Sequence, residues 1–408
     1  MSITSDSIIY LDNNANTIVP QVVLDVMVSW ANMGNPSAGH MYAKKCKHAF
    51  ELFKSELAAL FKISLDDFDL FFNSGASESN THIITSVVRS YRCSTGKRPH
   101  IITSGVEHNS IVACLNTLCE QDLVEWSELP ANFRSLMPAE LERAIKSNTA
   151  LISIMAANNE TGILNDIPAL YEVARSRNIP FHCDAVQQVG KLSFDAGHTD
   201  AFSVSFHKLH GPTGCGLIGI RKDLIAGYKL CALVCGSQNG GQRGGTENVM
   251  GIMGSFSAVR YTMSGLVDKV EKCLKLRALI VSQLSAAFDC KFISEVRTVE
   301  VSDVPRIVWL APPEFQGTIP NTVLLTVIKQ GICNKSLKSA LETYKIIVGL
   351  GSACKTESTA HHNILEALHV PAEMRAGVLR VSLDAMNTES DILTFTTRLS
   401  ELIQLSVK

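Results

Sequence analysis

The sequence predicts an α/β protein: a large domain built on a mostly parallel sheet flanked by helices, and a smaller α+β domain. Between about residues 68 and 225, short apolar runs alternate with helix-like segments, which is the rhythm of successive β-α-β units. A glycine-rich stretch at 235–251 closes this region, and long helical periodicity follows it. We therefore expect a large domain at 16–254 and a small one formed by 1–15 and 255–408.

The expected strands of the large domain are near-continuous apolar runs, as strands buried on both faces of a parallel sheet should be. Between them, the segment IPALYEVARSRN at 167–178 is typical of an amphipathic helix. In such sheets, ligands bind beyond the carboxyl ends of the strands, so functional residues are expected there. The runs lie at 99–105, 150–158, 179–185, 201–206 and 215–221.

The small domain is expected to begin with helical periodicity over 255–288 and to continue with shorter elements. The motif TESD at 388–391 has the form of a capping box and predicts the start of a last helix. Between these helices we expect a strand in VPRIVWLA (304–311), a helix in NTVLLTVIKQG (321–331), and strands in YKIIVGLGS (344–352) and GVLRVSLD (377–384).

Composition narrows the function classes. At 408 residues, with 46% hydrophobic and 19% charged residues, the chain can bury two cores. A net charge of -2 gives no global field that would recruit nucleic acid or an anionic membrane, so a small molecule or a protein partner is expected. No segment has the pattern of an export signal or a membrane span, which favours a cytoplasmic protein. Twelve cysteines without a CxxC pair predict mostly buried, reduced thiols and no metal site.

The stretch SFHKLHGPTG ends an apolar strand with Ser205, His207 and Lys208. A lysine at such a strand end can be desolvated, which lowers the pKa of its amine and makes it a nucleophile toward an aldehyde. A lysine that simply reaches solvent is the alternative. The neighbouring hydroxyl, imidazole and glycines suit an anionic group.

Asp184 ends the strand predicted at 179–185, where a carboxylate is costly unless it meets a cation or a strong donor. A helix cap is the alternative. Together with Lys208, it matches the needs of pyridoxal phosphate: a lysine joined to the cofactor aldehyde and a carboxylate that keeps the ring nitrogen protonated. The strand, Gly-Ala-Ser turn and helix start at 71–84 suit the phosphate. His108 could stack on the ring or transfer protons, or be structural.

Ten short motifs carry a resemblance that runs, in order, over almost the whole chain. They are YLDNNANT, GNPSAGH, SGASES, EHNSI, NNETG, HCDAVQQVGK, SFHKLHGPTG, RGGTEN, GSAC and LRVSL. Together they resemble the cysteine desulfurases, pyridoxal 5'-phosphate enzymes of the class V aminotransferase group. The resemblance implies the fold of type I pyridoxal phosphate enzymes, with a seven-stranded sheet in the large domain, and a homodimer. It also implies conversion of L-cysteine to L-alanine and transfer of the sulfur to an acceptor protein such as an iron–sulfur scaffold.

The resemblance also implies a role for each matching residue. It makes Lys208 the Schiff-base lysine, places Asp184 on the pyridine nitrogen and Gln187 at the phenolic oxygen. His108 would stack on the ring and transfer protons. The remaining roles are Ser77, Ser205 and His207 at the phosphate, Asn159 at cofactor and substrate, Arg380 at the substrate carboxylate, and Thr246 at the phosphate of the neighbouring subunit.

Cys354, in GLGSACKTEST, matches the family's nucleophile, which takes the substrate sulfur as a persulfide. An inert thiol is its alternative, and a strand-ending arginine in a surface ion pair is the alternative for Arg380. Selenocysteine lyase, a related class V lyase or transaminase, and a catalytically silent binding protein remain rival functions. The chain departs from the family pattern at Phe206, Gly240 and Lys355.

Overall fold

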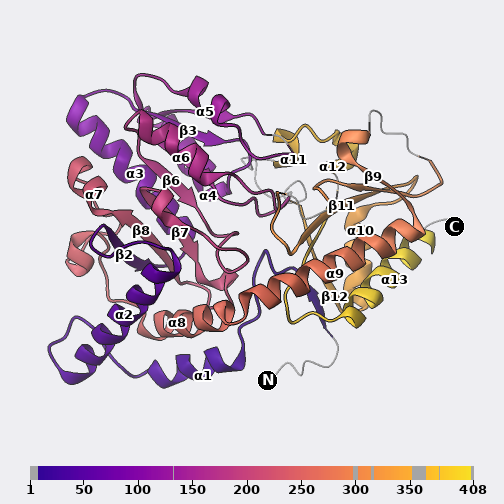
Figure 1. The fold of residues 1–408 in the computed structure, drawn as a ribbon, viewed down its shortest axis with the longest axis horizontal. Helices are drawn as coiled ribbons and strands as arrows, with labels where there is room; N and C mark the ends of the chain where they lie inside the picture. Colours follow the sequence, from indigo (N-terminus) through magenta and orange to yellow (C-terminus); the bar gives the residue numbers. More distant parts are fainter. Residues whose placement is uncertain are drawn as a thin grey trace.

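The computed structural model describes residues 8–131, 133–296, 302–313, 317–351, 364–375 and 377–405. They form two packed units, each built on its own sheet, which lie side by side in Figure 1. Within these ranges, no helix is long and apolar enough to cross a bilayer.

The larger unit contains a seven-stranded sheet in the order β2-β8-β7-β6-β5-β3-β4. Neighbouring strands are parallel, except that β8 runs antiparallel to both β2 and β7. The predicted mostly parallel seven-stranded sheet is therefore confirmed, with strands in all five predicted runs. The strands are β2 (Phe68–Asn73), β3 (His100–Ser104), β4 (Glu125–Leu129), β5 (Thr149–Met155), β6 (Phe181–Asp184), β7 (Ala201–Ser205) and β8 (Gly216–Arg221).

Helices cover both faces of this sheet. Successive strand residues point to opposite faces, and apolar side chains on both faces must be shielded from water. In β2, Phe72 packs in one core cluster with Phe53 and Phe256. The next residue toward the N-terminus, Phe71, packs in a different cluster, with Ile83 of α3. The helix predicted at 167–178 is α6. The helices are α1 (Gln21–Trp30), α2 (Met41–Leu60), α3 (Ala76–Thr95), α4 (Asn109–Glu120), α5 (Pro138–Ala144), α6 (Ile167–Ser176), α7 (Lys222–Tyr228) and α8 (Val249–Met263).

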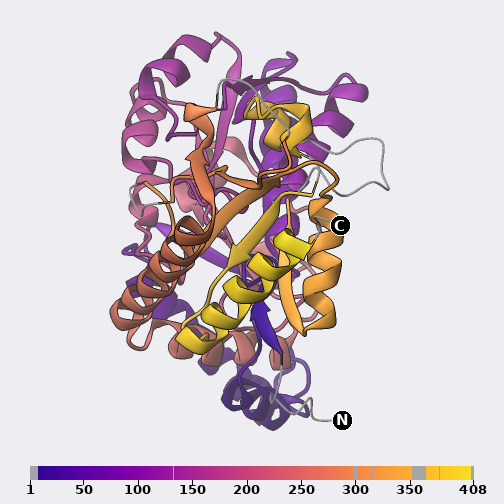
Figure 2. The same cartoon turned by 90° about the vertical axis from the view of Figure 1, so that its right-hand side faces the viewer.

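The smaller unit has a six-stranded sheet in the order β1-β12-β13-β11-β10-β9. Its strands are β1 (Ile9–Leu11), β9 (Asp289–Phe292), β10 (Arg306–Trp309), β11 (Thr322–Ile328), β12 (Ile346–Leu350) and β13 (Leu379–Ser382). Its helices are α9 (Leu266–Ala287), α10 (Asn334–Thr343), α11 (Ile364–Ala367), α12 (Ala372–Arg375) and α13 (Glu389–Leu405). Figure 2 shows α9, α13 and α10 lying next to one another over one face of the sheet.

The capping box predicted at 388–391 is present. The Thr388 N–H donates to Asp391 Oδ2 (2.8 Å) and the Asp391 N–H donates to Thr388 Oγ1 (3.1 Å). The start of α13 is thereby fixed by the pair of reciprocal bonds that the motif indicates.

The prediction of a helix at 321–331 is wrong, because Thr322–Ile328 forms strand β11. All seven residues of β11 are buried, between β10 and β13 in the sheet. A strand buried on both faces shows no alternation, so its apolar run has the same appearance as a buried helix. The five β-branched residues among the seven favour the strand.

The single periodic segment predicted at 255–288 is two helices, α8 and α9. They are separated at Gly265, whose φ of 65° lies in the left-handed region that glycine adopts without cost. Val249 and Phe256 of α8 belong to the core of the larger unit, whereas Leu276 and Ile280 of α9 belong to that of the smaller unit. The domain limits remain a prediction, and we propose that the division falls at Gly265.

The prediction that most cysteines are buried is wrong. Of the eleven described cysteines, four are buried, three are partly buried and four are exposed, and all eleven are free thiols. The fold leaves several of them on surface helices and loops, where their small size is tolerated.

Candidate active site

A cavity of about 510 Å³ lies at the carboxyl ends of β6 and β7, in the position where parallel sheets bind ligands. The smaller unit contributes Arg380 of β13, and the segment after β1 contributes Asn14. The cavity gathers nine of the residues predicted from the sequence: Ser77, His108, Asn159, Asp184, Gln187, Ser205, His207, Lys208 and Arg380.

Lys208 is placed by a single helical turn, Phe206–Lys208, that follows β7 directly. Its Nζ donates to the backbone oxygens of Asn14 (2.6 Å) and Ala15 (2.5 Å). The amine is therefore held inside the protein instead of extending into solvent.

Phe206, where the chain departs from the family, points away from the cavity. Its side chain is fully buried and its ring centroid lies 5.7 Å from that of Phe53 in the aromatic core. A Cβ at Gly211 would lie only 2.8 Å from the Phe206 carbonyl oxygen, so glycine is needed for the chain to turn back so tightly.

Asp184 presents a buried carboxylate at the end of β6. Asn80 Nδ2 donates to its Oδ2 (2.9 Å), and the Val186 N–H donates to its Oδ1 (3.1 Å). These neutral donors orient the carboxylate and leave it free to pair with a cationic ring nitrogen.

Ser77, Ser205 and the start of α3 form one end of the cavity. The N-cap of α3 is Gly75, which offers no capping side chain. The Glu78 N–H donates to the Gly75 carbonyl (3.0 Å), so the turn offers its Ala76 and Ser77 amides to an anion. A Cβ at Gly216 would lie 2.4 Å from Gly75 Cα, which shows how closely the neighbouring strand approaches this turn. The arrangement is typical of a phosphate site.

Glu78, in the first turn of α3, also lines the cavity. Its Oε1 accepts from Arg243 Nε (2.9 Å) and its Oε2 from the Ser74 N–H (2.9 Å). Burial alone would raise the pKa of Glu78, but the bonds to Arg243 and Ser74 outweigh burial and hold this pKa below its usual value. Arg243 thus neutralises an acidic group that would otherwise repel a phosphate.

His207 carries its proton on a defined nitrogen. Burial, together with the charge of Lys208, lowers the pKa of His207 to about 4, so the ring is neutral. Asn16 Nδ2 donates to the Thr17 carbonyl (3.0 Å), which leaves Asn16 Oδ1 to face His207 Nδ1 (3.0 Å). Nδ1 therefore holds the proton, and the ring can donate to a phosphate from Nε2 only after it gains a second proton.

Arg380 is both buried and paired. Its Nη2 donates to Asp12 Oδ1 (2.8 Å) and its Nη1 to the Asn159 carbonyl (3.2 Å). The ion pair is present, but Arg380 is buried, so it is not the surface ion pair of the alternative. Arg380 Nε and Asn159 Oδ1, however, are buried without a hydrogen-bond partner among the described residues. Unpartnered buried polar atoms at one cavity are the expected mark of a site built for a ligand.

Thr246 is not among the residues of this cavity, and His108 has a second, structural role. His108 lines the cavity and also caps α4, because its Nδ1 accepts from the Ser110 N–H (3.1 Å). Thr246 lines a separate small cavity beside Arg243 and not the one around Lys208. Cys354 and Lys355 lie outside the described residues.

Three residues that line or support this cavity escaped the sequence interpretation: Asn14 lines it, whereas Asn80 and Glu107 support residues around it. Asn14 accepts from both Lys208 and Gln187 through its carbonyl oxygen, a backbone role that leaves no mark on residue type. Asn80 donates to the Asp184 carboxylate. In the sequence, only its spacing of three residues from Ser77, which places both on the same face of α3, indicated that it lies near the site. Glu107, directly before His108, accepts from Ser104 Oγ (2.6 Å) and the Met155 N–H (2.9 Å).

The fold and this cavity define a class of protein, and comparison with known proteins agrees. The family model for the class V aminotransferases matches residues 9–395, so the chain belongs to that family. Within it, the chain is one of the cysteine desulfurases. It is 32% identical to the cysteine desulfurase IscS of Methanosarcina thermophila, over 98% of this chain and 93% of that protein.

Two further comparisons support the same placement. The cysteine desulfurase IscS of Dictyoglomus turgidum is 33% identical, over 94% of this chain and 91% of that protein. The solved structure of a NifS-like protein is 28% identical, with a TM-score of 0.83, and the match covers 98% of this chain and 100% of that chain.

Proposed function

We propose that this chain binds pyridoxal 5'-phosphate in the cavity around Lys208 and removes the sulfur atom of L-cysteine, leaving L-alanine. The observation that carries the proposal is the convergence of Lys208, Asp184 and the phosphate-type turn on one cavity at the strand ends. When bound, the cofactor supplies an electron-accepting ring that stabilises negative charge at the substrate Cα.

The residues present fit this cofactor. Lys208 and Asp184 follow neighbouring parallel strands, β7 and β6, and the start of α3 lies at the same cavity. Arg380 Nε and Asn159 Oδ1 are buried polar atoms that still lack partners among the described residues. The cofactor requires an amine, a carboxylate and an anion site. An amino acid substrate requires further hydrogen-bonding groups, and the cavity offers both sets.

Each side chain then has a role. The Lys208 amine carries the cofactor and afterwards takes and returns the proton at the substrate Cα. The Asp184 carboxylate holds the ring nitrogen protonated, and Ser77, Ser205 and the α3 amides bind the phosphate. Arg380 binds the substrate carboxylate, for which a planar guanidinium is suited because it can donate two parallel bonds.

Sulfur leaves the substrate by attack of a thiolate. The Cys354 thiolate forms a bond to the substrate sulfur, the carbon–sulfur bond breaks, and its electron pair stays on the three-carbon product. That product takes up a proton and leaves as alanine, and Cys354 holds a persulfide for a sulfur-acceptor protein such as an iron–sulfur scaffold.

Two mass measurements test the proposal. Borohydride treatment of the purified protein, followed by peptide mapping, should place a pyridoxyl group on Lys208. Incubation with L-cysteine should add the mass of one sulfur atom to the peptide that contains Cys354. Cys354→Ser should keep the pyridoxyl group but form no alanine. Alanine formation by Cys354→Ser would contradict the persulfide route, and absence of the pyridoxyl group would contradict the whole proposal.

We also propose a homodimer in which Thr246 serves the neighbouring subunit. Thr246 does not line its own subunit's Lys208 cavity. The exposed apolar side chains Val22, Val28 and Met41 of α1 and α2 offer a surface for self-association. Mixing the Lys208→Ala and Thr246→Ala proteins should restore cofactor affinity, because a mixed dimer contains one complete site. Absence of any recovery after subunit exchange would contradict the shared site.

A further inference from the structure

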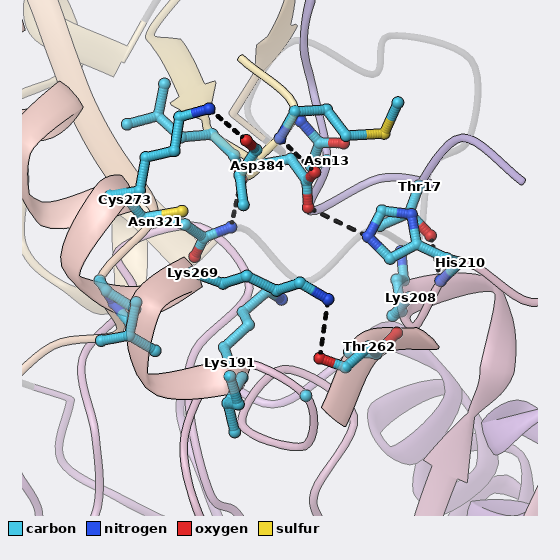
Figure 3. Close-up of a pocket in the computed structure, with 18 of the residues that line it drawn as sticks. Asn13, Thr17, Lys191, Lys208, His210, Thr262, Lys269, Cys273, Asn321 and Asp384 are labelled. Carbon is cyan, nitrogen blue, oxygen red and sulfur yellow. Dashed lines mark hydrogen bonds and ion pairs between the residues drawn. The ribbon is translucent and has the colours of Figure 1, made fainter. Parts of the chain in front are cut away.

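A second cavity, of about 310 Å³, also has Lys208 in its lining. It lies between the α8–α9 junction and the segment after β13, and Figure 3 shows Lys191, Lys208 and Lys269 extending into it. Lys191 is the lysine that links this cavity to the one proposed to bind the cofactor, because its side-chain Nζ donates to Gln187.

Lys191 is held in place by a tight backbone. It follows Gly190, which has a φ of 78° and at which a Cβ would lie 2.2 Å from Leu209 Cδ2. Only glycine is compatible with this conformation and this close approach. The Lys191 side chain is 9% exposed, and its Nζ lies 2.5 Å from Gln187 Oε1.

The ammonium fixes which way the Gln187 amide points. A lysine ammonium can only donate, so the atom of Gln187 that faces Lys191 is the oxygen. At the other end of the amide, Gln187 Nε2 donates to the Asn14 carbonyl (3.0 Å), which can only accept. A reversed amide would lose both bonds. One of the two N–H groups on Nε2 is then left for a ligand in the cavity that Gln187 lines.

Lys191 occupies this position at an electrostatic cost. Burial, together with the positive charges of Lys208 and Arg380, lowers the pKa of Lys191 to about 7, against the opposing effect of Asp384. Among the described residues, no carboxylate forms an ion pair with Lys191. An apolar side chain of similar length would avoid the cost of burying a charge. We therefore interpret the ammonium by its effect on Gln187, which is to fix the orientation of the amide.

We propose that Lys191 is a positioning residue, which locks the Gln187 amide in the orientation that offers an N–H to the phenolic oxygen of the cofactor. This inference rests on the proposed function, since it assumes that the cavity beside Gln187 binds pyridoxal 5'-phosphate. A donor at that oxygen stabilises its negative charge and so shifts the visible absorbance of the bound cofactor.

Lys191→Met tests the inference through the cofactor spectrum. We expect the variant to bind pyridoxal 5'-phosphate, to shift its visible absorbance band in the same direction as Gln187→Ala, and to lower kcat by about tenfold. Lys191→Arg keeps a donor and should restore most of the wild-type spectrum. Lys269→Met is the matched control, because Lys269 lines the same cavity but its described Nζ hydrogen bonds lead to the carbonyls of Tyr261 and Thr262 and not to Gln187. Its spectrum should equal that of the wild type.

A double-mutant comparison separates positioning from general damage. If Lys191 acts through Gln187, Lys191→Met should change neither the spectrum nor kcat further when added to Gln187→Ala. Equal effects in both backgrounds, or an unchanged spectrum in Lys191→Met, would overturn the inference while leaving the proposed function intact. A wild-type protein that binds no cofactor would overturn both. If Lys191→Met does not fold, Lys191→Leu, which also lacks a donor, carries the same comparison, with the same outcomes.

Discussion

The two cavities that share Lys208 differ in whether their polar groups are already satisfied. At the larger cavity, Arg380 Nε and Asn159 Oδ1 are buried without partners among the described residues. At the smaller one, His210 Nε2 bonds to Asp384 Oδ2 (3.1 Å) and Lys272 Nζ to the Ala385 carbonyl (2.6 Å). The difference indicates that the larger cavity is built for a ligand, whereas the smaller is a joint between the two units.

The largest expected effect comes from removing the amine common to both cavities. Lys208→Ala should lower kcat/KM for L-cysteine by about a thousandfold or more, because the covalent attachment and the proton transfer are both lost. Steady-state alanine formation measures it. Circular dichroism should be unchanged, since Lys208 Nζ donates to the carbonyls of Asn14 and Ala15, which lie in a loop. A loss below tenfold would remove Lys208 from the chemistry and weaken the distinction between the cavities.

The next effect concerns the Arg380 guanidinium at the larger cavity, whose Nε lacks a hydrogen-bond partner among the described residues. Arg380→Lys should lower kcat/KM by about a hundredfold, mostly through KM, since an ammonium cannot donate two parallel bonds to a carboxylate. Asp12→Asn is the matched control: it weakens the existing ion pair at Arg380 Nη2 but keeps the guanidinium, so its effect should be smaller. An equal effect of the two substitutions would mean that Arg380 acts through its ion pair.

Glu107, behind the larger cavity, predicts a dependence of stability on pH. Burial raises the pKa of Glu107 to about 8 in the folded protein, above its unfolded value of about 4.3. Stability linked to this proton is therefore complete below the unfolded pKa and is lost as the pH rises toward the folded pKa. Glu107→Gln cannot ionise, so its advantage in unfolding free energy over the wild type should grow with pH and reach a few kcal/mol above about pH 8.

Urea unfolding of the cofactor-free proteins at several pH values measures this advantage. Glu51→Gln is the control, because Glu51 is exposed on α2 and should show no comparable trend. A constant difference between Glu107→Gln and the wild type across this pH range would contradict the buried, protonated carboxyl group.

The smallest expected effect is at the smaller cavity. Burial would raise the pKa of Asp384, but its bond to His210 outweighs burial and lowers it. Asp384→Asn should therefore cost about 1 kcal/mol of stability at neutral pH, and the cost should disappear as the pH falls through the folded pKa of Asp384. The visible spectrum of the bound cofactor should not change. A spectral change would show that the second cavity, too, acts on the cofactor.

Much of the fold could be predicted because parallel strands buried on both faces produce continuous apolar runs. The same property hides β11, whose seven buried residues have no alternation that would separate a strand from a helix. The sequence could single out Lys208 and Asp184, which line one cavity, because their residue types carry chemistry; their roles remain predictions. Site residues were missed where a backbone atom acts, as at Asn14, or where a bond such as that from Asn80 to Asp184 forms only in the folded chain.

Strand β1 has a consequence for the order in which the molecule assembles. Its residues pair with Ile346–Val348 of β12, and the following Asn13 and Asn14 bond to Ser382 of β13. During synthesis on the ribosome, β1 emerges long before β12 and β13 and must therefore wait for them before it finds its neighbours. Since the Asn14 carbonyl also receives Lys208 and Gln187, a nascent chain whose seven-stranded sheet has already formed still lacks a finished catalytic centre.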